Sequence, residues 1–410
     1  MKAASIVSVF VLFMYNSSLA IFLTYGVFFS SVTRQFHVTS FWTSLVFAVF
    51  AILYSASSIG MGFLMDTYGP SKTILFGGML MALGLILSTF ATSILVLVLT
   101  YGVLAGSGTG SMWLPTSFLV FEKFEASRVR ELTGIVSAGT AFGSLFYAPM
   151  EAYVISVFGW RAAFLVLGVL VFILTLSASV VAQRKRSGEQ SDASADKVAS
   201  GVRRVELTSA FREVKKSGGF WSLYFYYMLG NAFSRTLVVL FLVPMLEARG
   251  FGVFVGSIAL AMVGGGSMIG RLFTRIRSIS EEQIAALSFL LQGISAIGLF
   301  YSGNIFTIYL VSFAFGIGYG GYIPQFALII RKRYGLALYG GIFGLLLTSF
   351  GVGAFLGPVI GAVSHSISGS FAWIFYLASA WSIVVGLHQL LSFRTGKREK
   401  IDGKIYSSIE

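Results

Sequence analysis

The sequence predicts an all-α membrane protein with twelve transmembrane helices arranged in two six-helix halves. Three observations lead to this fold class. The 410-residue chain is 56% hydrophobic and only 11% charged, whereas soluble domains carry about 25% charged residues. Its mean hydropathy is +0.85. Its apolar residues form long continuous runs and lack the alternating pattern of membrane β-strands, so helices are expected to cross the bilayer.

Apolar windows long enough for one crossing, which takes about 20 residues, occur twelve times along the chain. The windows are 6–33, 41–65, 72–91, 94–121, 130–153, 160–183, 219–246, 252–274, 283–301, 305–330, 339–363 and 370–393. The first follows Lys2 and is too long for the apolar region of a signal peptide, so we expect an uncleaved first span.

One long polar connection divides these windows six and six. We therefore predict an N-terminal bundle over residues 1–183, a linker over 184–218, a C-terminal bundle over 219–393 and a tail over 394–410. Two parallel halves around a polar connection are a layout that places a substrate site between the halves at mid-membrane.

The basic residues predict the orientation of the chain. Of its 29 Lys and Arg residues, 24 fall in the termini and in the loops on the same side, and three fall in the opposite loops. This bias predicts a multi-pass protein of the cell membrane with both termini in the cytoplasm. The net charge of +13 is explained by these loops, so we expect no nucleic-acid partner.

Two arginines, Arg235 and Arg271, lie within the apolar stretches, and we expect no Asp or Glu deep in any span. A cation within the hydrocarbon is costly unless it faces a polar cavity or a partner. Since no acidic partner is evident, the pattern predicts an anionic substrate and a membrane carrier.

The segment 62–72 reads GFLMDTYGPSK and follows the second window. Its Gly62, Asp66, Gly69 and Lys72 resemble the loop motif of the major facilitator superfamily. The glycines allow a tight turn and close helix approach. The resemblance implies a conformational, gating role for these four residues; an ordinary charged loop is the alternative.

Further segments resemble one branch of that superfamily, the monocarboxylate transporters and oxalate–formate antiporters. They are residues 25–29 (YGVFF), 121–143 (FEKFEASRVRELTGIVSAGTAFG) and 158–164 (FGWRAAF). The string Gly106–Gly110 (GSGTG) lies within an apolar window, so it predicts close helix packing rather than a nucleotide loop. The resemblance implies alternating-access transport of a small carboxylate.

Arg271 resembles the arginine of this branch that contacts the substrate carboxylate in the eighth span; the alternative is an arginine extending to the cytoplasmic surface. Arg235 has no counterpart known to us. It could bind a second carboxylate or bond carbonyl groups at a helix break. Two departures leave the coupling open between proton symport and anion exchange: Ser267 stands where proton-coupled carriers often have an acid, and the eleventh window carries no charge.

Aromatic residues complete the predicted substrate site. Tyr319, Tyr322 and Phe315 lie in the glycine-rich tenth window, and Tyr25 and Trp113 lie in the N-terminal half. Hydroxyl groups would bond an anion and rings would contact its carbon body; helix packing is the alternative for each residue.

We expect a monomeric secondary transporter in the lipid bilayer that carries a small mono- or dicarboxylate, with protons as a candidate second partner. The three histidines have no ligand spacing, and no catalytic arrangement stands out, so we expect no metal, cofactor or enzyme activity. The chain has no cysteine, which excludes disulfides. Two alternatives are an efflux carrier for amphipathic compounds and a membrane sensor that transports nothing.

Overall fold

The computed structural model describes residues 3–124, 126–183, 218–275, 278–334 and 339–394. Within these residues, eleven helices are long and apolar enough to cross a membrane. One of them covers 50 residues, which is far more than the roughly 20 needed for one crossing. Its chain reverses at Gly159, so it supplies two crossings. The total of twelve confirms the predicted fold class.

The N-terminal half is formed by helices that end at residue 183. They are α1 (Ala3–Ser17), α2 (Ala20–Thr24), η1 (Tyr25–Val27), α3 (Phe29–Phe36), α4 (Ser40–Tyr68), α5 (Pro70–Ser88), α6 (Ile94–Leu97), η2 (Val98–Ala105), α7 (Gly106–Thr109), α8 (Trp113–Lys123) and α9 (Ala126–Gln183).

The C-terminal half begins at residue 218. It contains α11 (Gly218–Tyr226), η3 (Tyr227–Phe233), α12 (Ser234–Ala248), α13 (Gly252–Arg271), η4 (Leu272–Arg275), α14 (Glu281–Tyr301), α15 (Ile305–Tyr334), α16 (Tyr339–Ser368) and α17 (Ala372–Arg394). Nearly all of the predicted linker and tail lies outside the described residues.

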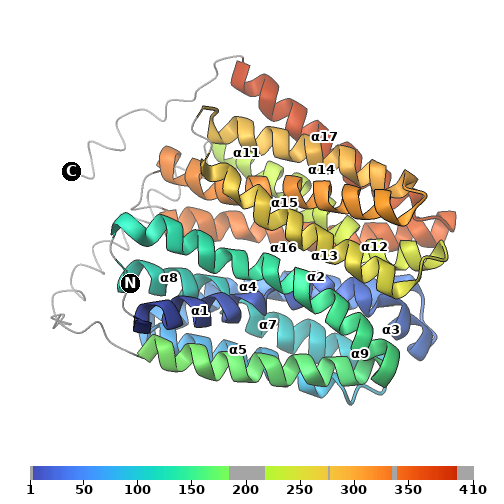
Figure 1. The fold of residues 1–410 in the computed structure, drawn as a ribbon, viewed down its shortest axis with the longest axis horizontal. Coiled ribbons are helices and arrows are strands. Elements are labelled where there is room, and N and C mark those ends of the chain that lie inside the picture. The colour runs from blue at the N-terminus through green and yellow to red at the C-terminus, as the bar shows by residue number, and fades with distance from the viewer. Residues whose placement is uncertain (1–2, 125, 184–217, 276–277, 335–338, 395–410) are drawn as a thin grey trace.

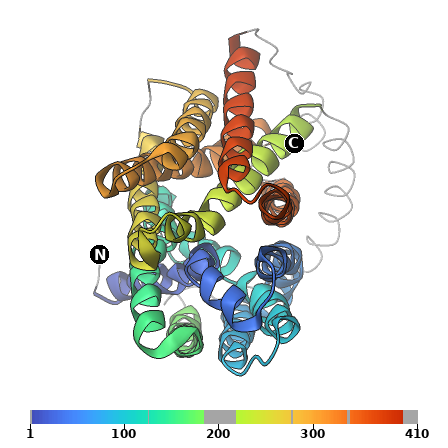
Figure 2. The ribbon, with the colours of Figure 1, turned by 90° about the vertical axis from the view of Figure 1, so that its right-hand side faces the viewer.

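The two halves lie side by side, with the helices running along the long axis of the molecule (Figure 1). In the end view, the blue-to-green half lies below and the yellow-to-red half above (Figure 2). Helix α1 begins and α17 ends at the same end of the bundle, which we call the terminal end; the opposite end is the distal end.

Two helix pairs form the long contacts between the halves. Helix α4 packs on α16, where the Ser55 hydroxyl donates to the Leu347 carbonyl at 2.7 Å. Helix α9 packs on α13 at Gly264, where a methyl group would lie 2.8 Å from the Leu145 backbone nitrogen. We call these two helix contacts the seams between the halves. A conformational change that moves one half relative to the other would have to act on them.

Three crossings are interrupted rather than continuous. The first contains the break between α1 and α2 and the 3₁₀ turn η1, and the fourth and seventh contain the π-helical segments η2 and η3. At the first break, the Asn16 amide donates to the Val136 carbonyl of α9 at 2.8 Å. Such breaks are tolerated in membrane helices where they are buried in protein, and they often mark functional sites.

Two glycines make the turns that the sequence predicts. Gly69 (φ +83°) ends α4, and Gly159 (φ +82°) reverses α9. Both angles lie in the left-handed region that residues with a Cβ rarely adopt. The predicted loop between the fifth and sixth windows is thereby reduced to a tight turn at Gly159 between the two helices of α9.

The Gly106–Gly110 string packs helices closely, which confirms its predicted role. A Cβ on Gly106 would lie 2.9 Å from backbone atoms of Phe50 in α4. Backbone atoms of α4 cannot move away as a side-chain tip could, so only glycine fits there.

We predict that Gly106→Ala lowers the midpoint of thermal unfolding, because overpacking a tight contact costs about 1–3 kcal/mol. The matched control is Gly134→Ala, since a Cβ there meets nothing within 4 Å. Tryptophan fluorescence of the detergent-solubilised protein would report both midpoints. Equal midpoints for Gly106→Ala and wild type would contradict the packing argument.

Candidate functional site

Arg235 is buried near the middle of the crossing formed by α11, η3 and α12, with an exposed fraction of 6%. Its guanidinium carbon lies 4.9 Å from the ring centres of both Tyr319 in α15 and Phe350 in α16. Its Nε is buried without a hydrogen-bond partner. Ring faces stabilise a cation only in part, so donor capacity on Arg235 remains available to a ligand.

Arg271 is partly buried at the end of α13 and lies at the interface between the halves. Its Nη1 donates to the carbonyl of Ser137 in α9 at 2.6 Å. A side-chain hydrogen bond also joins Arg271 to Tyr319. Tyr319 therefore contacts both arginines, and the structure brings together three residues that the sequence predicted as one site.

Tyr322 lies beside this group. Its hydroxyl donates to Asn231 Oδ1 in the π-helical segment η3 at 2.9 Å, and its ring stacks on Phe289. Phe315 is fully buried one turn before Tyr319 in α15. Both residues thus lie with Tyr319 on α15. The hydrogen bond of Tyr322 joins this helix to η3, the segment just before Arg235.

The two predicted aromatics of the N-terminal half occupy different surroundings. Tyr25 is fully buried, stacks on Tyr101 at 4.9 Å and donates to the Thr43 carbonyl at 3.4 Å. Trp113 is partly buried at the start of α8. Within the described residues, no hydrogen bond or cation–ring contact joins Tyr25 or Trp113 to Arg235.

Two aromatic residues of the site were missed by the sequence analysis. Phe350 in α16 faces Arg235, and Tyr54 in α4 lies 5.7 Å from the Phe350 ring and interacts electrostatically with Arg235. Tyr54 belongs to the N-terminal half, so both halves contribute aromatic residues to the surroundings of Arg235. In the sequence, each is one of several aromatics in its apolar window, and neither carried a signal that distinguished it from lipid-facing residues.

The expectation of no acidic residue deep in a span is wrong. Glu151 in α9 is fully buried, and Thr24 of α2 donates to its Oε1 at 2.7 Å. The predicted window ended at residue 153, which put Glu151 at its edge. The helix instead continues to Gly159, so Glu151 lies about 12 Å below the turn at 1.5 Å per residue.

Arg235 has no counter-charge among the described carboxylates. No carboxylate of the described residues forms an ion pair with it. The groups that interact with it electrostatically are four tyrosines and the second arginine, namely Tyr54, Tyr227, Tyr319, Tyr322 and Arg271. Glu151 is absent from this set, so the buried acid does not compensate the buried cation.

The predicted gating residues lie at the terminal end. Gly62 is in α4, where a Cβ would make ordinary contact with Leu114 at 3.4 Å. Gly69 makes the turn, and Lys72 Nζ lies 5.8 Å from the Tyr68 ring centre. The side chain of Asp66 lies outside the described residues, so its role stays a prediction.

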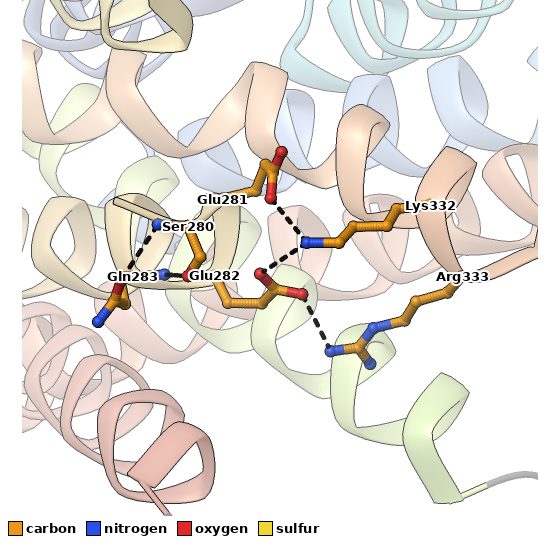
Figure 3. A network of polar contacts seen from close by, with 6 residues as sticks. All are labelled: Ser280, Glu281, Glu282, Gln283, Lys332 and Arg333. Carbon is orange, nitrogen blue, oxygen red and sulfur yellow. Dashed lines mark hydrogen bonds and ion pairs between the residues drawn. The ribbon is translucent and has the colours of Figure 1, made fainter. Parts of the chain in front are cut away.

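The terminal end also carries an ionic cluster between α14 and α15 (Figure 3). Lys332 pairs with Glu281 at 3.0 Å, and Arg333 with Glu282 at 3.7 Å. Ser280 caps α14 in a capping box. These pairs are partly exposed, and each contributes only about 0–1 kcal/mol, so their effect is to hold the two helix ends in register.

The distal end is closed by the first and seventh crossings. A Cβ on Gly26 of η1 would lie 2.8 Å from the Leu240 carbonyl oxygen of α12. The rings of Phe29 and Phe241 lie 5.5 Å apart. Arg34 of α3 and Glu247 of α12 form an ion pair at 3.0 Å. Each of these three contacts joins the N-terminal half to the C-terminal half.

A hollow of about 270 Å³ also opens at the distal end, lined by Met245, Arg249, Phe300, His365 and Phe371 among others. Arg249 lies 4.4 Å from the Phe300 ring centre, and partial burial lowers the pKa of Arg249 from its ordinary value. This hollow contains none of the residues predicted for the substrate site.

Comparison with known proteins gives the family. Residues 5–335 match the sequence model of the Major Facilitator Superfamily. The chain belongs to this superfamily. Among curated proteins it is similar to monocarboxylate transporter 11 of Mus musculus, with 25% identity over 350 residues, covering 81% of this chain and 74% of that protein. It is also similar to monocarboxylate transporter 2 of Homo sapiens, with 20% identity over 390 residues, covering 89% and 80%.

Solved structures agree on the fold of this superfamily member. Two structures of a bacterial homologue of the human lysosomal transporter Spinster superpose with TM-scores of 0.69 and 0.72 at 14% identity. They cover 96% of this chain and 96% and 98% of theirs. Both are inward-facing, one unoccupied and one occupied. The family and its relatives identify a membrane transporter rather than an enzyme.

We predict that Phe29→Cys combined with Phe241→Cys is joined in high yield by a short bifunctional thiol reagent, because the two rings are in contact. The chain has no cysteine of its own, so no other thiol competes. Cross-linking should stop transport in proteoliposomes by holding the distal end shut. The two single variants are the controls, and transport that survives complete cross-linking would show that this contact does not need to open.

Proposed function

We propose that this superfamily member carries a small organic anion, a mono- or dicarboxylate, by alternating access, and that Arg235 and Arg271 bind its carboxylate. The observation that carries the proposal is Arg235: a buried cation with ring faces as its contacts, an unpartnered Nε and no ion pair to a described carboxylate. An anionic substrate would supply the missing charge.

The donor chemistry of the site supports a carboxylate. A guanidinium presents a planar fork of N–H donors that matches a carboxylate and stays protonated at all physiological pH values. Tyr319 contacts both arginines and can donate its hydroxyl to the same anion. Tyr322, Phe315, Phe350 and Tyr54 offer apolar ring surface to the carbon body, and Tyr25 and Trp113 remain candidates from the N-terminal half.

The similarity to monocarboxylate transporters points in the same direction. Tyr319 contacts both arginines. The two guanidinium groups can therefore bind one carboxylate together, or each can bind one carboxylate group of a dicarboxylate. We therefore assign the substrate as a small organic carboxylate and keep both classes in the test.

The charge of the site also suggests how the carrier reorients during transport. In the empty carrier, closing both ends around an unpaired cation moves that charge away from water at a cost of several kcal/mol. A bound anion offsets the charge, so the loaded carrier reorients more readily than the empty one. Exchange of external for internal anion should then be faster than net uptake.

We further propose that the terminal end faces the cytoplasm of the cell, because most Lys and Arg residues lie in its loops and in both termini. Under this assignment the closed distal end faces outward. The glycine turn with Asp66 and Lys72 would then act as the cytoplasmic gate between the second and third crossings, and residues 184–218 would join the two bundles.

The direct test is uptake of labelled lactate, pyruvate, oxalate and formate into proteoliposomes. We predict uptake of at least one acid by wild type and a loss of more than about tenfold, about 1.4 kcal/mol, in Arg235→Lys and in Arg271→Lys, because an ammonium keeps the charge but not the fork. Arg249→Lys, at the distal hollow, is the matched control and should retain uptake. Uptake indifferent to both site arginines would favour efflux of amphipathic compounds instead.

A second prediction concerns the mode of transport. Vesicles preloaded with the unlabelled acid should take up labelled acid faster than empty vesicles, since the empty site must reorient with Arg235 uncompensated. Equal rates with and without internal acid would contradict the mechanism while leaving the substrate assignment intact.

A further inference from the structure

Glu151 is a second buried charge-bearing group, and the proposed substrate site makes no use of it. It is fully buried in α9, and its Oε2 has no hydrogen-bond partner in the described structure. Ser137, which contacts Arg271, lies 14 residues earlier in the same helix, and this separates the two sites by about 21 Å along the axis. Arg271 is therefore too distant to act as its counter-ion.

The surroundings of Glu151 contain polar groups but no described cation. Thr24 of α2 donates to Oε1 at 2.7 Å. Tyr101 of η2 and Tyr147 of α9 interact with it electrostatically, and both are buried. Helix α13, which packs on α9, carries Arg271 as its single ionisable residue, at its other end. Helix α12, which packs on α2 and η1, carries Arg235 and Glu247, and Glu247 pairs with Arg34.

Burial without a cation favours the neutral form of a carboxyl group, because an isolated carboxylate in low dielectric is far more costly than a carboxylic acid. The surroundings of Glu151 in the conformation with the distal end closed therefore favour its protonated form.

The hydrogen-bond partner of Glu151 belongs to the distal closure. Thr24 is the last residue of α2 and directly precedes η1, whose Gly26 packs on the Leu240 carbonyl of α12. Opening the distal end requires α2, η1 and α3 to part from α12. Thr24 and Glu151 lie in the same half, whereas α12 lies in the other. We expect the parting of the halves to admit water to the carboxyl from the distal side, which ties proton exchange at Glu151 to the state of the closure.

We propose that Glu151 is the proton-binding site of this carrier, so that one proton crosses on its carboxyl with each carboxylate substrate. The proton binds to a carboxylate oxygen of Glu151 from water on one side of the membrane and returns to water on the other side. No other bond changes. This inference rests on the proposed function, because it needs a substrate whose movement the proton accompanies.

The test follows substrate and protons together in proteoliposomes containing a trapped pH indicator dye. Wild type should acidify the lumen as a carboxylate enters and should accumulate that acid under an inward proton gradient. Glu151→Gln keeps the shape and an acceptor for Thr24 but cannot release a proton. It should retain exchange at symmetric pH within about twofold and lose proton-driven accumulation by more than about tenfold.

A second variant keeps the carboxyl. Thr24→Val removes a hydrogen bond that favours the ionised form. The pH at which exchange falls as Glu151 deprotonates should therefore move upward relative to wild type. The pH-difference infrared spectrum of the wild-type protein should contain a carboxylic-acid band that is absent from Glu151→Gln, and this readout stands even if that variant transports nothing.

The outcomes separate the two proposals. If wild type carries no carboxylate, the proposed function fails. If wild type exchanges a carboxylate but moves no protons with it, or if Glu151→Gln accumulates acid as wild type does, the function stands and the assignment of Glu151 is overturned. An unchanged infrared spectrum in Glu151→Gln would overturn it as well.

Discussion

Arg235, a buried arginine that pairs with no carboxylate of the described residues, is the constraint around which this carrier is arranged. A guanidinium at the centre of a membrane helix costs about 2.5–3.5 kcal/mol by insertion scales. The faces of Tyr319 and Phe350 recover part of that cost. What remains is a positively charged site in the middle of the protein, which an anion stabilises and an empty carrier must tolerate.

The architecture supplies a place for that charge to act. The seventh crossing changes to a π-helical segment just before Arg235, and Tyr322 is tied to that segment through Asn231. Tyr319 then links Arg235 to Arg271, and Arg271 bonds a carbonyl of the opposite half. Under the proposed function, a ligand on the two arginines would therefore touch both the C-terminal half and its contact with the N-terminal half, on which reorientation would have to act.

Much of the fold could be predicted because it follows from apolar length and loop charge. Most described helical crossings end within a few residues of their predicted windows, while the fifth runs past residue 153 to Gly159. Arg235, Arg271 and Tyr319 were also accessible, since a cation or a cluster of tyrosines in an apolar run is unusual. Phe350 and Tyr54 were not, because their role depends on which side of a helix faces the seam. Glu151 was misjudged because a helix end cannot be located well enough by composition to separate a surface acid from one about 12 Å below the turn.

The measurement that tests the central claim most directly is the thermal stability of the purified protein with an anion and with its uncharged counterpart. A ligand that binds the folded carrier raises its unfolding midpoint by mass action. We predict that a transported carboxylate raises the midpoint of wild type, that its methyl ester does not, and that Arg235→Met abolishes the difference. Equal shifts by acid and ester, or a full shift in Arg235→Met, would contradict the claim that the buried arginine recruits the substrate by charge.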